Sequence, residues 1–499
     1  MILTEQVNHV QRAKELLNRP WNMLIGGKLT GALNGKTFDA YSPATNEFLA
    51  AVPAAQQEDV ERAVEVAEEA FHKWKKTPVS ERIKMVRQMI AVLEENAVDL
   101  AILDSIDSGN PLINMIGDVN LSCKQLDYYC GAVLEMKGST IPSTLENWHL
   151  TRREPFGVVG RIIPFNHPLM FTASKIGAPI LTGNTIVLKV PKLASLAPLY
   201  IAELIKDIFP PGVVNIISGD GRTAGDTLVR HPRVKRIALI GSVETGRQIQ
   251  LSAAEVAIKQ ISLELGGKNP MIVFPDVDID AAVAGAIRGM NFTWQGQSCG
   301  STSRLFLHKD IHDEFVEKLK EQVEKIRVGY PLDPDTEMGC LISQSQLEKV
   351  EGYIKLAKEE GAHCLTGGER LTGPQFENGN FIQPTVFTNV TSDMRIAQEE
   401  IFGPVLSVLK WEDEDEVIKE ANSVDYGLTG AVWTNDIHKA FKVVDQLETG
   451  FTWINGSSMH FSGVPYGGYK NSGLGSEESI EELYSYTQVK AVNIMLGQQ

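Results

Sequence analysis

Three consecutive runs, TIVLKV at 185–190, APLYIAELIKDIF at 197–209 and VVNIIS at 213–218, lie in one part of the chain. The first and third are short, apolar and rich in β-branched residues, as in buried strands. The middle run is amphipathic and is closed by Pro210-Pro211-Gly212. Strand, helix and strand within about 35 residues predict a parallel βαβ unit, because parallel strands need a crossover of this length. Similar runs, VVGRII at 158–163 and RIALIG at 236–241, predict further strands of the same sheet.

The rest of the chain divides on either side of this sheet. Residues 1–150 are predicted to be mostly helical after a short polar entry, because apolar residues recur at helical spacing over 58–74. A second helix is expected to begin with Ser80 as its N-cap. A second α/β series follows residue 266, with strands expected at 271–274, 304–308, 405–411, 428–434 and 450–455 and helices at 281–290 and 311–327. The prediction is an α/β protein with two α/β units.

Composition limits the classes of partner. The 499 residues include 47 Lys and Arg against 63 Asp and Glu, so the net charge is −16. Nucleic acid and anionic membranes are therefore excluded as main partners, because phosphate contacts need clustered cations. Five scattered cysteines form no C-x-x-C pair, which excludes a disulfide framework and a structural zinc site and favours a reducing compartment. The N-terminal 19 residues lack the apolar core of a signal peptide, so a cytoplasmic protein without metal is expected.

Four segments carry residues suited to chemistry. Glu264 in LELGGKNP precedes two glycines, Cys299 in NFTWQGQSCGSTSR has small neighbours that leave a thiol accessible, and Asn166 stands in PFNHP. The fourth combines EEIFGPV at 399–405 with PYGGYKNSG at 465–473. Taken singly, each has a structural reading: a paired acid, a buried thiol and simple turns. In addition, Gly241 and Gly246 of GSVETG follow a strand and precede a helix, where backbone N–H groups can hold a pyrophosphate.

Together, in this order and spacing, these segments and LKVPK at 188–192 resemble the aldehyde dehydrogenase superfamily, from YSPATNE at 41–47 to the C-terminus. The resemblance implies that Cys299 adds to the aldehyde as the nucleophile. It implies that Asn166 and the backbone N–H of Cys299 stabilise the oxyanion, and that Glu264 activates the water that hydrolyses the thioester. Lys175 matches a lysine of a proton relay. The presence of Glu264 predicts that the product is released as a free acid and that the acyl group is not transferred to coenzyme A.

The resemblance also implies a site for NAD or NADP. Lys189 and Glu400 match residues that hold the two riboses, Phe402 packs near the nicotinamide, and Ser242 and Thr245 serve the pyrophosphate and adenine. The remaining implied contacts are Ile163, Pro164, Gly225, Gly241 and Leu265. Lys192 stands where many members carry a Glu that repels a 2′-phosphate. It is either an exposed lysine or a cation that admits NADP.

The implied aldehyde tunnel is lined by Phe165, His167, Phe171, Thr293, Trp294, Met459, His460 and Tyr466. These aromatic residues favour a medium-sized or aromatic aldehyde. The two histidines are either packing residues or hydrogen-bonding groups for a polar substrate, since imidazole can donate in both protonation states. None of the eight is Arg, which weakens a clamp for a substrate carboxylate.

The resemblance implies a Rossmann-like cofactor domain (1–127 and 150–266), a catalytic domain (267–470) and a small β oligomerisation element (128–149 and 471–499). A homodimer or homotetramer is expected, because LYSYTQVKAVNIM at 483–495 suits an added edge strand. Two alternatives stay open: a coenzyme A-acylating dehydrogenase and a non-catalytic structural relative.

Overall fold

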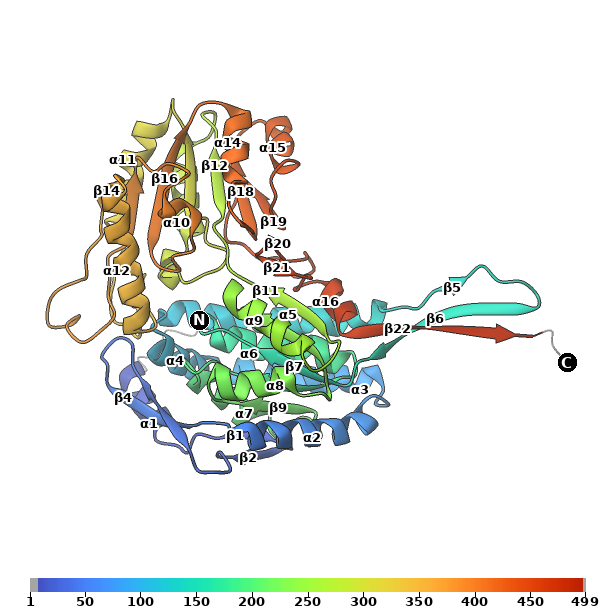
Figure 1. The fold of residues 1–499 in the computed structure, drawn as a ribbon. Helices are drawn as coiled ribbons and strands as arrows, with labels where there is room; N and C mark the ends of the chain where they lie inside the picture. Colours follow the sequence, from blue (N-terminus) through green and yellow to red (C-terminus); the bar gives the residue numbers. More distant parts are fainter. Residues whose placement is uncertain (1–7, 497–499) are drawn as a thin grey trace.

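A computed structural model of the chain describes residues 8–496, so residues 1–7 of the N-terminal stretch and 497–499 of the C-terminal element lie outside it. Figure 1 shows two α/β bodies stacked on one another and a long β arm that leaves the lower body. Within the described part, no helix is long and apolar enough to cross a membrane. All five cysteines are free thiols.

The lower body is built on an eight-stranded sheet in the order β2-β1-β9-β8-β7-β10-β11-β21. Its five central strands are parallel. The expected strands are confirmed as β7 (Val158–Ile162), β8 (Thr185–Lys189), β9 (Val214–Ile217) and β10 (Val234–Ile240), joined by β11 (Gln260–Glu264). The edge strands β2 (Lys28–Thr30) and β21 (Gly473–Leu474) are antiparallel to their neighbours, and so is β1 (Met23–Ile25), which lies between β2 and β9.

Alternation along β8 explains why this sheet is covered on both faces. Ile186 and Leu188 pack into one hydrophobic core, and Val187 between them packs into another. Both faces of a parallel strand are therefore apolar and need helices. One face carries α3 (Val79–Glu95), α4 (Ala97–Ser108), α5 (Leu112–Ala132), α6 (Pro168–Leu181) and α7 (Leu196–Ile205). The other carries α2 (Gln57–Trp74), α8 (Asp226–Arg230) and α9 (Val243–Ala254).

The upper body holds a seven-stranded sheet in the order β14-β15-β16-β13-β12-β18-β19. The expected strands are found as β12 (Pro270–Val273), β13 (Arg304–His308), β16 (Val405–Trp411), β18 (Thr429–Trp433) and β19 (Phe451–Ile454), with β14 (His363–Thr366) and β15 (Thr385–Thr388) in addition. The helices of this body are α10 (Ile279–Met290), α11 (His312–Val323), α12 (Gln344–Glu359), α13 (Arg395–Gln398), α14 (Glu414–Ala421) and α15 (Ile437–Val444).

The arm is a three-stranded antiparallel sheet, β22-β6-β5. β22 (Thr487–Met495) pairs along its whole length with β6 (Asn147–Pro155), and β5 (Thr140–Ile141) adds a short third strand. The arm therefore uses residues up to 155, beyond the expected boundary at 149. Residues 128–132 are helical in α5, and β21 belongs to the lower sheet.

Two local predictions were wrong. Ser80 is not an N-cap: Pro78 takes that position and α3 begins at Val79, because proline fixes a backbone angle suited to a helix start. The entry before α2 is not simply polar, since it contains α1 (His9–Leu17), β1, β2 and the hairpin of β3 (Thr37–Tyr41) and β4 (Phe48–Pro53). Strands of three residues, such as β1 and β2, are too short for an alternating pattern to be found from sequence.

Candidate active site

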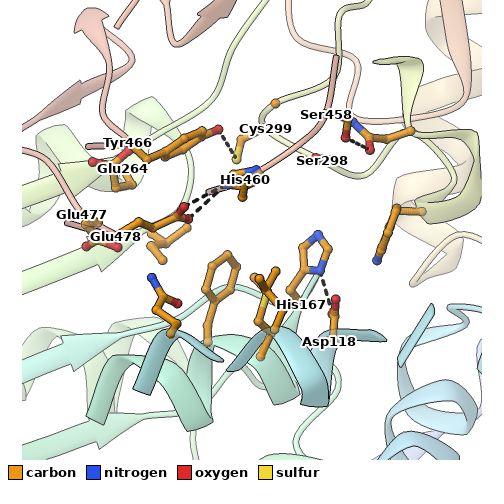
Figure 2. A pocket seen from close by; sticks show the side chains of 18 of the residues that line it. Asp118, His167, Glu264, Ser298, Cys299, Ser458, His460, Tyr466, Glu477 and Glu478 are labelled. Atoms are coloured by element: carbon orange, nitrogen blue, oxygen red, sulfur yellow. Dashed lines mark hydrogen bonds and ion pairs between the residues drawn. The ribbon is translucent and has the colours of Figure 1, made fainter. Parts of the chain in front are cut away.

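A cavity of about 180 Å³ lies where α5, α6, the end of β11 and loops of the upper body meet. Figure 2 shows Cys299 near its centre, with Glu264, Glu477 and Glu478 on one side and His167 on the other. Seven of the predicted residues line it: His167, Phe171, Glu264, Trp294, Cys299, His460 and Tyr466. The fold thus collects into one space residues that are up to about 300 positions apart in the chain.

Cys299 lies in a loop between α10 and β13 that a buried amide holds in place. The side chain of Asn269 donates to the carbonyls of Cys299 (2.8 Å) and Ser301 (2.9 Å). The Cys299 Sγ is 3.8 Å from the hydroxyl of Tyr466. Burial raises the pKa of the Cys299 thiol to about 12, and the Tyr466 hydrogen bond acts in the opposite direction. The thiol therefore needs a proton acceptor before it can attack.

Glu264 is the last residue of β11 and is almost fully buried. Within residues 8–496, neither of its carboxylate oxygens has a hydrogen-bond partner. Burial raises the pKa of Glu264 well above its usual range, and the nearby Glu477 carboxylate adds to the effect while Lys175 opposes it. A carboxylate with a raised pKa and free oxygens is suited to take a proton.

Behind the cavity wall lies a buried ion cluster that joins the lower sheet to the C-terminal segment. Glu477 accepts from Arg161 in a two-pronged pair, at 2.9 Å for one prong, and its carboxylate is 2.8 Å from the Lys175 ammonium. Lys175 also contacts Glu482 at 3.2 Å, and Tyr129 donates to Glu482. Although burial works against charge, these carboxylates raise the pKa of Lys175 above its ordinary value. Lys175 is thus held as a cation that contacts Glu477, a residue of the cavity lining.

Asn166 is buried and directly precedes His167, the N-cap of α6. Its backbone carbonyl accepts from the side chain of Asn110 (3.1 Å), which fixes the turn. In the described part of the chain its side-chain oxygen has no partner. Its amide therefore keeps unused hydrogen-bonding capacity next to the cavity-lining His167.

Three predicted tunnel residues lie elsewhere. Thr293 lines a separate groove beside α10 and α11, Met459 is 41% exposed and is not part of the cavity wall, and Phe165 packs edge-on against Phe402 with ring centroids 5.8 Å apart. The register of a loop cannot be read from its sequence, so neighbours in a motif can face opposite ways.

The carboxyl ends of the parallel strands form a second element of the site. The register brings Ile162 beside Lys189 and Ile240 beside Glu264, so the segments after β7, β8, β10 and β11 begin at one sheet edge. In open α/β sheets this edge is the ligand crevice. The predicted cofactor residues that lie at or just after strand ends here are Ile163, Pro164, Lys189, Lys192, Gly241, Ser242, Thr245 and Leu265, with Gly225 ending the turn after β9.

Two glycines at this edge lie close against neighbouring side chains. Ser242 caps α9, because its side chain accepts from the Thr245 N–H. The first N–H groups of a helix have no partner within the helix. A Cβ at Gly246 would lie 2.8 Å from a terminal methyl of Leu265, so a larger residue would require that side chain to move. A Cβ at Gly266 would overlap the carboxylate of Glu400, which accepts from the Gly267 N–H at 3.0 Å. This geometry fits a dinucleotide, with the pyrophosphate at the α9 terminus.

The two lysines of this edge differ in environment. Lys189 is buried, and burial lowers its pKa to about 8, with Asp220 acting in the opposite direction. Lys192 is exposed, with its ammonium 5.7 Å from the centroid of the Phe38 ring. Lys192 therefore keeps the mobility of a surface cation beside the cofactor edge.

Sequence reasoning missed Asp118, Gln125, Glu477 and Glu478, which also line the cavity. Asp118 and Gln125 lie inside α5, where nothing distinguishes them from other polar helix residues. Glu477 and Glu478 follow PYGGYKNSG within a few residues. Two adjacent acids shortly after this motif were the signal by which Glu477 and Glu478 could have been found.

Comparison with known proteins agrees with this geometry. The chain matches the family described as "Aldehyde dehydrogenase family" over residues 31–492. It is 45% identical to aldehyde dehydrogenase tropH of Talaromyces stipitatus, over 97% of this chain and 95% of that protein. It is 42% identical to an aldehyde dehydrogenase of Emericella nidulans, over 96% of each chain.

Solved structures agree with the fold. The NAD+ complex of aldehyde dehydrogenase from Bacillus cereus is 40% identical, covers 99% of both chains and superposes with a TM-score of 0.94. The P. syringae indole-3-acetaldehyde dehydrogenase AldA, as a mutant in complex with NAD+ and IAA, is 34% identical, covers 98% of this chain and 100% of that one, and has a TM-score of 0.95. With its sequence, site and fold in agreement, this chain belongs to the aldehyde dehydrogenase family.

Proposed function

We propose that this chain oxidises an aldehyde to the free carboxylic acid with NAD+ or NADP+, through a covalent intermediate on Cys299. The family supports aldehyde oxidation in general. The observation that carries the finer proposal is that the half-buried Cys299 thiol shares one cavity with the Glu264 carboxylate, which has no hydrogen-bond partner among residues 8–496.

In the first step the Cys299 thiol gives up its proton to solvent water and the thiolate adds to the aldehyde carbon. The C–S bond forms as the C=O π pair moves onto oxygen, which gives the thiohemiacetal oxyanion. In this proposal the Asn166 side-chain amide and the Cys299 backbone N–H donate to that oxygen, each worth about 3–4 kcal/mol of barrier. Tyr466, 3.8 Å from Sγ, stabilises the thiolate before attack.

When bound, the nicotinamide ring accepts the hydride that leaves the tetrahedral carbon, so a thioester remains on Cys299. Glu264 then removes a proton from water, the water oxygen adds to the thioester carbon, and the C–S bond breaks. The products are the free acid and the regenerated thiol. Lys175, held by Glu477, keeps its charge near Glu264 and acts there as a positioning residue.

The cofactor residues proposed from sequence fit a dinucleotide at the strand edge. Lys189 and Glu400 would hold the riboses, and the N-terminus of α9 would hold the pyrophosphate. The relatives crystallised with NAD+ support the nicotinamide cofactor. Lys192 would admit a 2′-phosphate, so Lys192→Glu should lower kcat/KM for NADP+ relative to NAD+. An unchanged ratio would leave Lys192 as a surface lysine.

We also propose a medium-sized or aromatic aldehyde as substrate. Phe171, Trp294, Trp453 and Tyr466 contribute aromatic surface to the cavity. A cavity of about 150 Å³ lined by apolar side chains accepts benzene. The 180 Å³ found in this chain is therefore enough for one aromatic ring. A relative named for indole-3-acetaldehyde supports the aromatic class.

The β arm supports assembly into a homodimer or homotetramer. It extends away from both bodies (Figure 1), and apolar side chains on it are exposed, among them Trp148 (54%) and Met495 (62%). The outer edge of β22, at the side of the sheet, offers backbone groups to another strand. Light scattering coupled to size exclusion would give the subunit number, and a monomer at micromolar concentration would refute assembly.

We also propose that the protein acts in the reducing cytoplasm, where its free thiols would stay reduced.

The test of the main proposal is product formation without coenzyme A. Purified protein with benzaldehyde and NAD+ should form NADH and benzoate in equal amounts, and Cys299→Ser should abolish both. Cys364→Ser is the matched control, because this partly exposed thiol lies in β14 and is not part of the cavity wall. Product that appears only with coenzyme A would support the acylating alternative. Inactivity with every aldehyde and both cofactors would support the structural one.

A further inference from the structure

Two histidines of the cavity are each held by a carboxylate that the proposed reaction does not use. His167, at the start of α6, has its Nδ1 2.8 Å from Asp118 of α5. His460, after β19, has its Nδ1 2.9 Å from Glu478, which lies just before α16 (Ile480–Ser485). Figure 2 shows one pair below the cavity and the other beside Cys299. The two pairs come from four separate parts of the fold and face one space.

Both imidazoles are fixed in orientation by packing as well as by the carboxylate. The His167 ring lies 5.7 Å from Phe171 and 5.3 Å from Trp294, between ring centroids. The His460 ring lies 4.8 Å from Tyr466 and stacks on Phe451 at 6.0 Å. A ring held on several sides has one favoured direction for its remaining nitrogen.

Glu478 adopts a left-handed backbone conformation, with φ of 65°, which is uncommon for a residue with a side chain. Its carbonyl accepts from the Gly463 N–H, and its N–H donates to Glu482, both at 2.9 Å. This strained backbone keeps the carboxylate on His460, and strain of this kind gathers at functional sites.

Three of the four carboxylates that line the cavity are paired, and the fourth, Glu264, is the proposed base. Asp118 and Glu478 each face a histidine, and Glu477 faces Arg161 and Lys175. Among residues 8–496, no Lys or Arg lines the cavity, and no protein group hydrogen-bonds Nε2 of either ring. Besides the Glu264 carboxyl and the hydroxyl and amide groups of the lining, a bound molecule therefore meets two oriented imidazole nitrogens and no Lys or Arg side chain.

We propose that these two histidines select an aldehyde carried on a single aromatic ring with a hydroxyl substituent, with Asp118 and Glu478 as positioning residues. The inference rests on the proposed oxidation of aldehydes. A hydroxyl matches an imidazole Nε2 in either protonation state, because it both donates and accepts. An anionic substituent would meet the carboxylates without a countering cation, and a cationic one would find those carboxylates occupied.

The test compares kcat/KM for benzaldehyde with that for its 2-, 3- and 4-hydroxy derivatives. The best hydroxy derivative should exceed benzaldehyde by at least tenfold. That ratio should fall at least fivefold in His167→Phe or His460→Phe. Glu478→Gln, which keeps an acceptor for His460, should retain more of the preference than Glu478→Leu. Glu481→Gln, an exposed acid three residues further on, is the matched control and should keep the wild-type ratio.

Two further measurements separate this inference from the proposed reaction. 4-Hydroxyacetophenone, a ketone that cannot be oxidised in this way, should bind at least tenfold more tightly than acetophenone in calorimetry, and the difference should vanish in the histidine variants. Oxidation of benzaldehyde without any hydroxyl preference overturns the inference alone. Preference for 4-formylbenzoate or for a trimethylammonium benzaldehyde also overturns it. Failure to oxidise any aldehyde counts against the proposed function, while the ketone comparison still tests the histidines.

Discussion

Replacing Glu477 by Gln should destabilise the protein strongly, although the change is nearly isosteric. The carboxylate is 4% exposed and lies between Arg161 (1%) and Lys175 (2%), so the variant leaves two buried cations without their shared anion. Breaking a buried pair on one side costs about 3–5 kcal/mol. At roughly 2–4 °C per kcal/mol for a domain of this size, the melting temperature should fall by about 6–20 °C.

The assay is thermal unfolding at pH 7 and equal protein concentration, with Glu481→Gln as the exposed control. The pH dependence has a definite sign. Although burial opposes it, Arg161 and Lys175 lower the pKa of Glu477 from 4.5 to about 2. Its stabilisation is therefore complete above pH 4.5 and is lost as the pH falls toward 2. The gap between wild type and variant should be constant from pH 5 to 8 and narrow below 4.5.

The same variant should change catalysis. Burial raises the pKa of Glu264, and the charge of Glu477 raises it further, while Lys175 lowers it. Removing the Glu477 charge should therefore lower the pKa of Glu264 and move the rise of kcat to lower pH. A melting temperature within about 2 °C of the wild type, together with an unmoved pH profile, would refute the assignment of a buried ion cluster that acts on Glu264.

Three further outcomes follow from the site. Glu264→Gln should give one rapid NADH per active subunit in stopped flow and then turn over about 10²–10⁴-fold more slowly, and full steady turnover would remove its role as base. Tyr466→Phe removes the hydroxyl beside the Cys299 thiol, so the pKa of Cys299 should rise. Iodoacetamide should then alkylate Cys299 more slowly at a given pH. An equal rate would exclude that hydrogen bond from thiol activation. Because burial lowers the pKa of Lys189 to about 8, the KM for NAD+ should rise from pH 7 to 9 in the wild type. In Lys189→Met the KM should be high and independent of pH, and a parallel rise in both would contradict the assignment.

The strand pattern of the parallel sheets could be predicted because buried parallel strands read as continuous apolar runs. TIVLKV is one example, with every residue of β8 buried. The three-residue strand β1 was missed, because no local pattern specifies its position between β2 and β9. Its place depends on pairing with β9, which is about 190 residues away, as in the pair Leu24 and Ile216.

The motif residues of the site could be predicted, whereas their surroundings could not. Cys299, Glu264 and Asn166 stand in recognisable segments. Asp118 and Glu478 do not, and their partners, His167 and His460, were read as either packing or binding residues. The sequence contains no trace of contacts such as His460 with Glu478, because they depend on how separate loops close over the cavity.

Sequence alone therefore determined the two α/β units and the order of the motif segments that carry the proposed nucleophile and base, because these depend on local periodicity and on short motifs. Only the tertiary structure decided which side chains share the cavity, that Lys175 is held by Glu477 and Glu482, and that two carboxylates orient the histidines. Burial and facing charges set these properties, and both arise only when distant segments pack together.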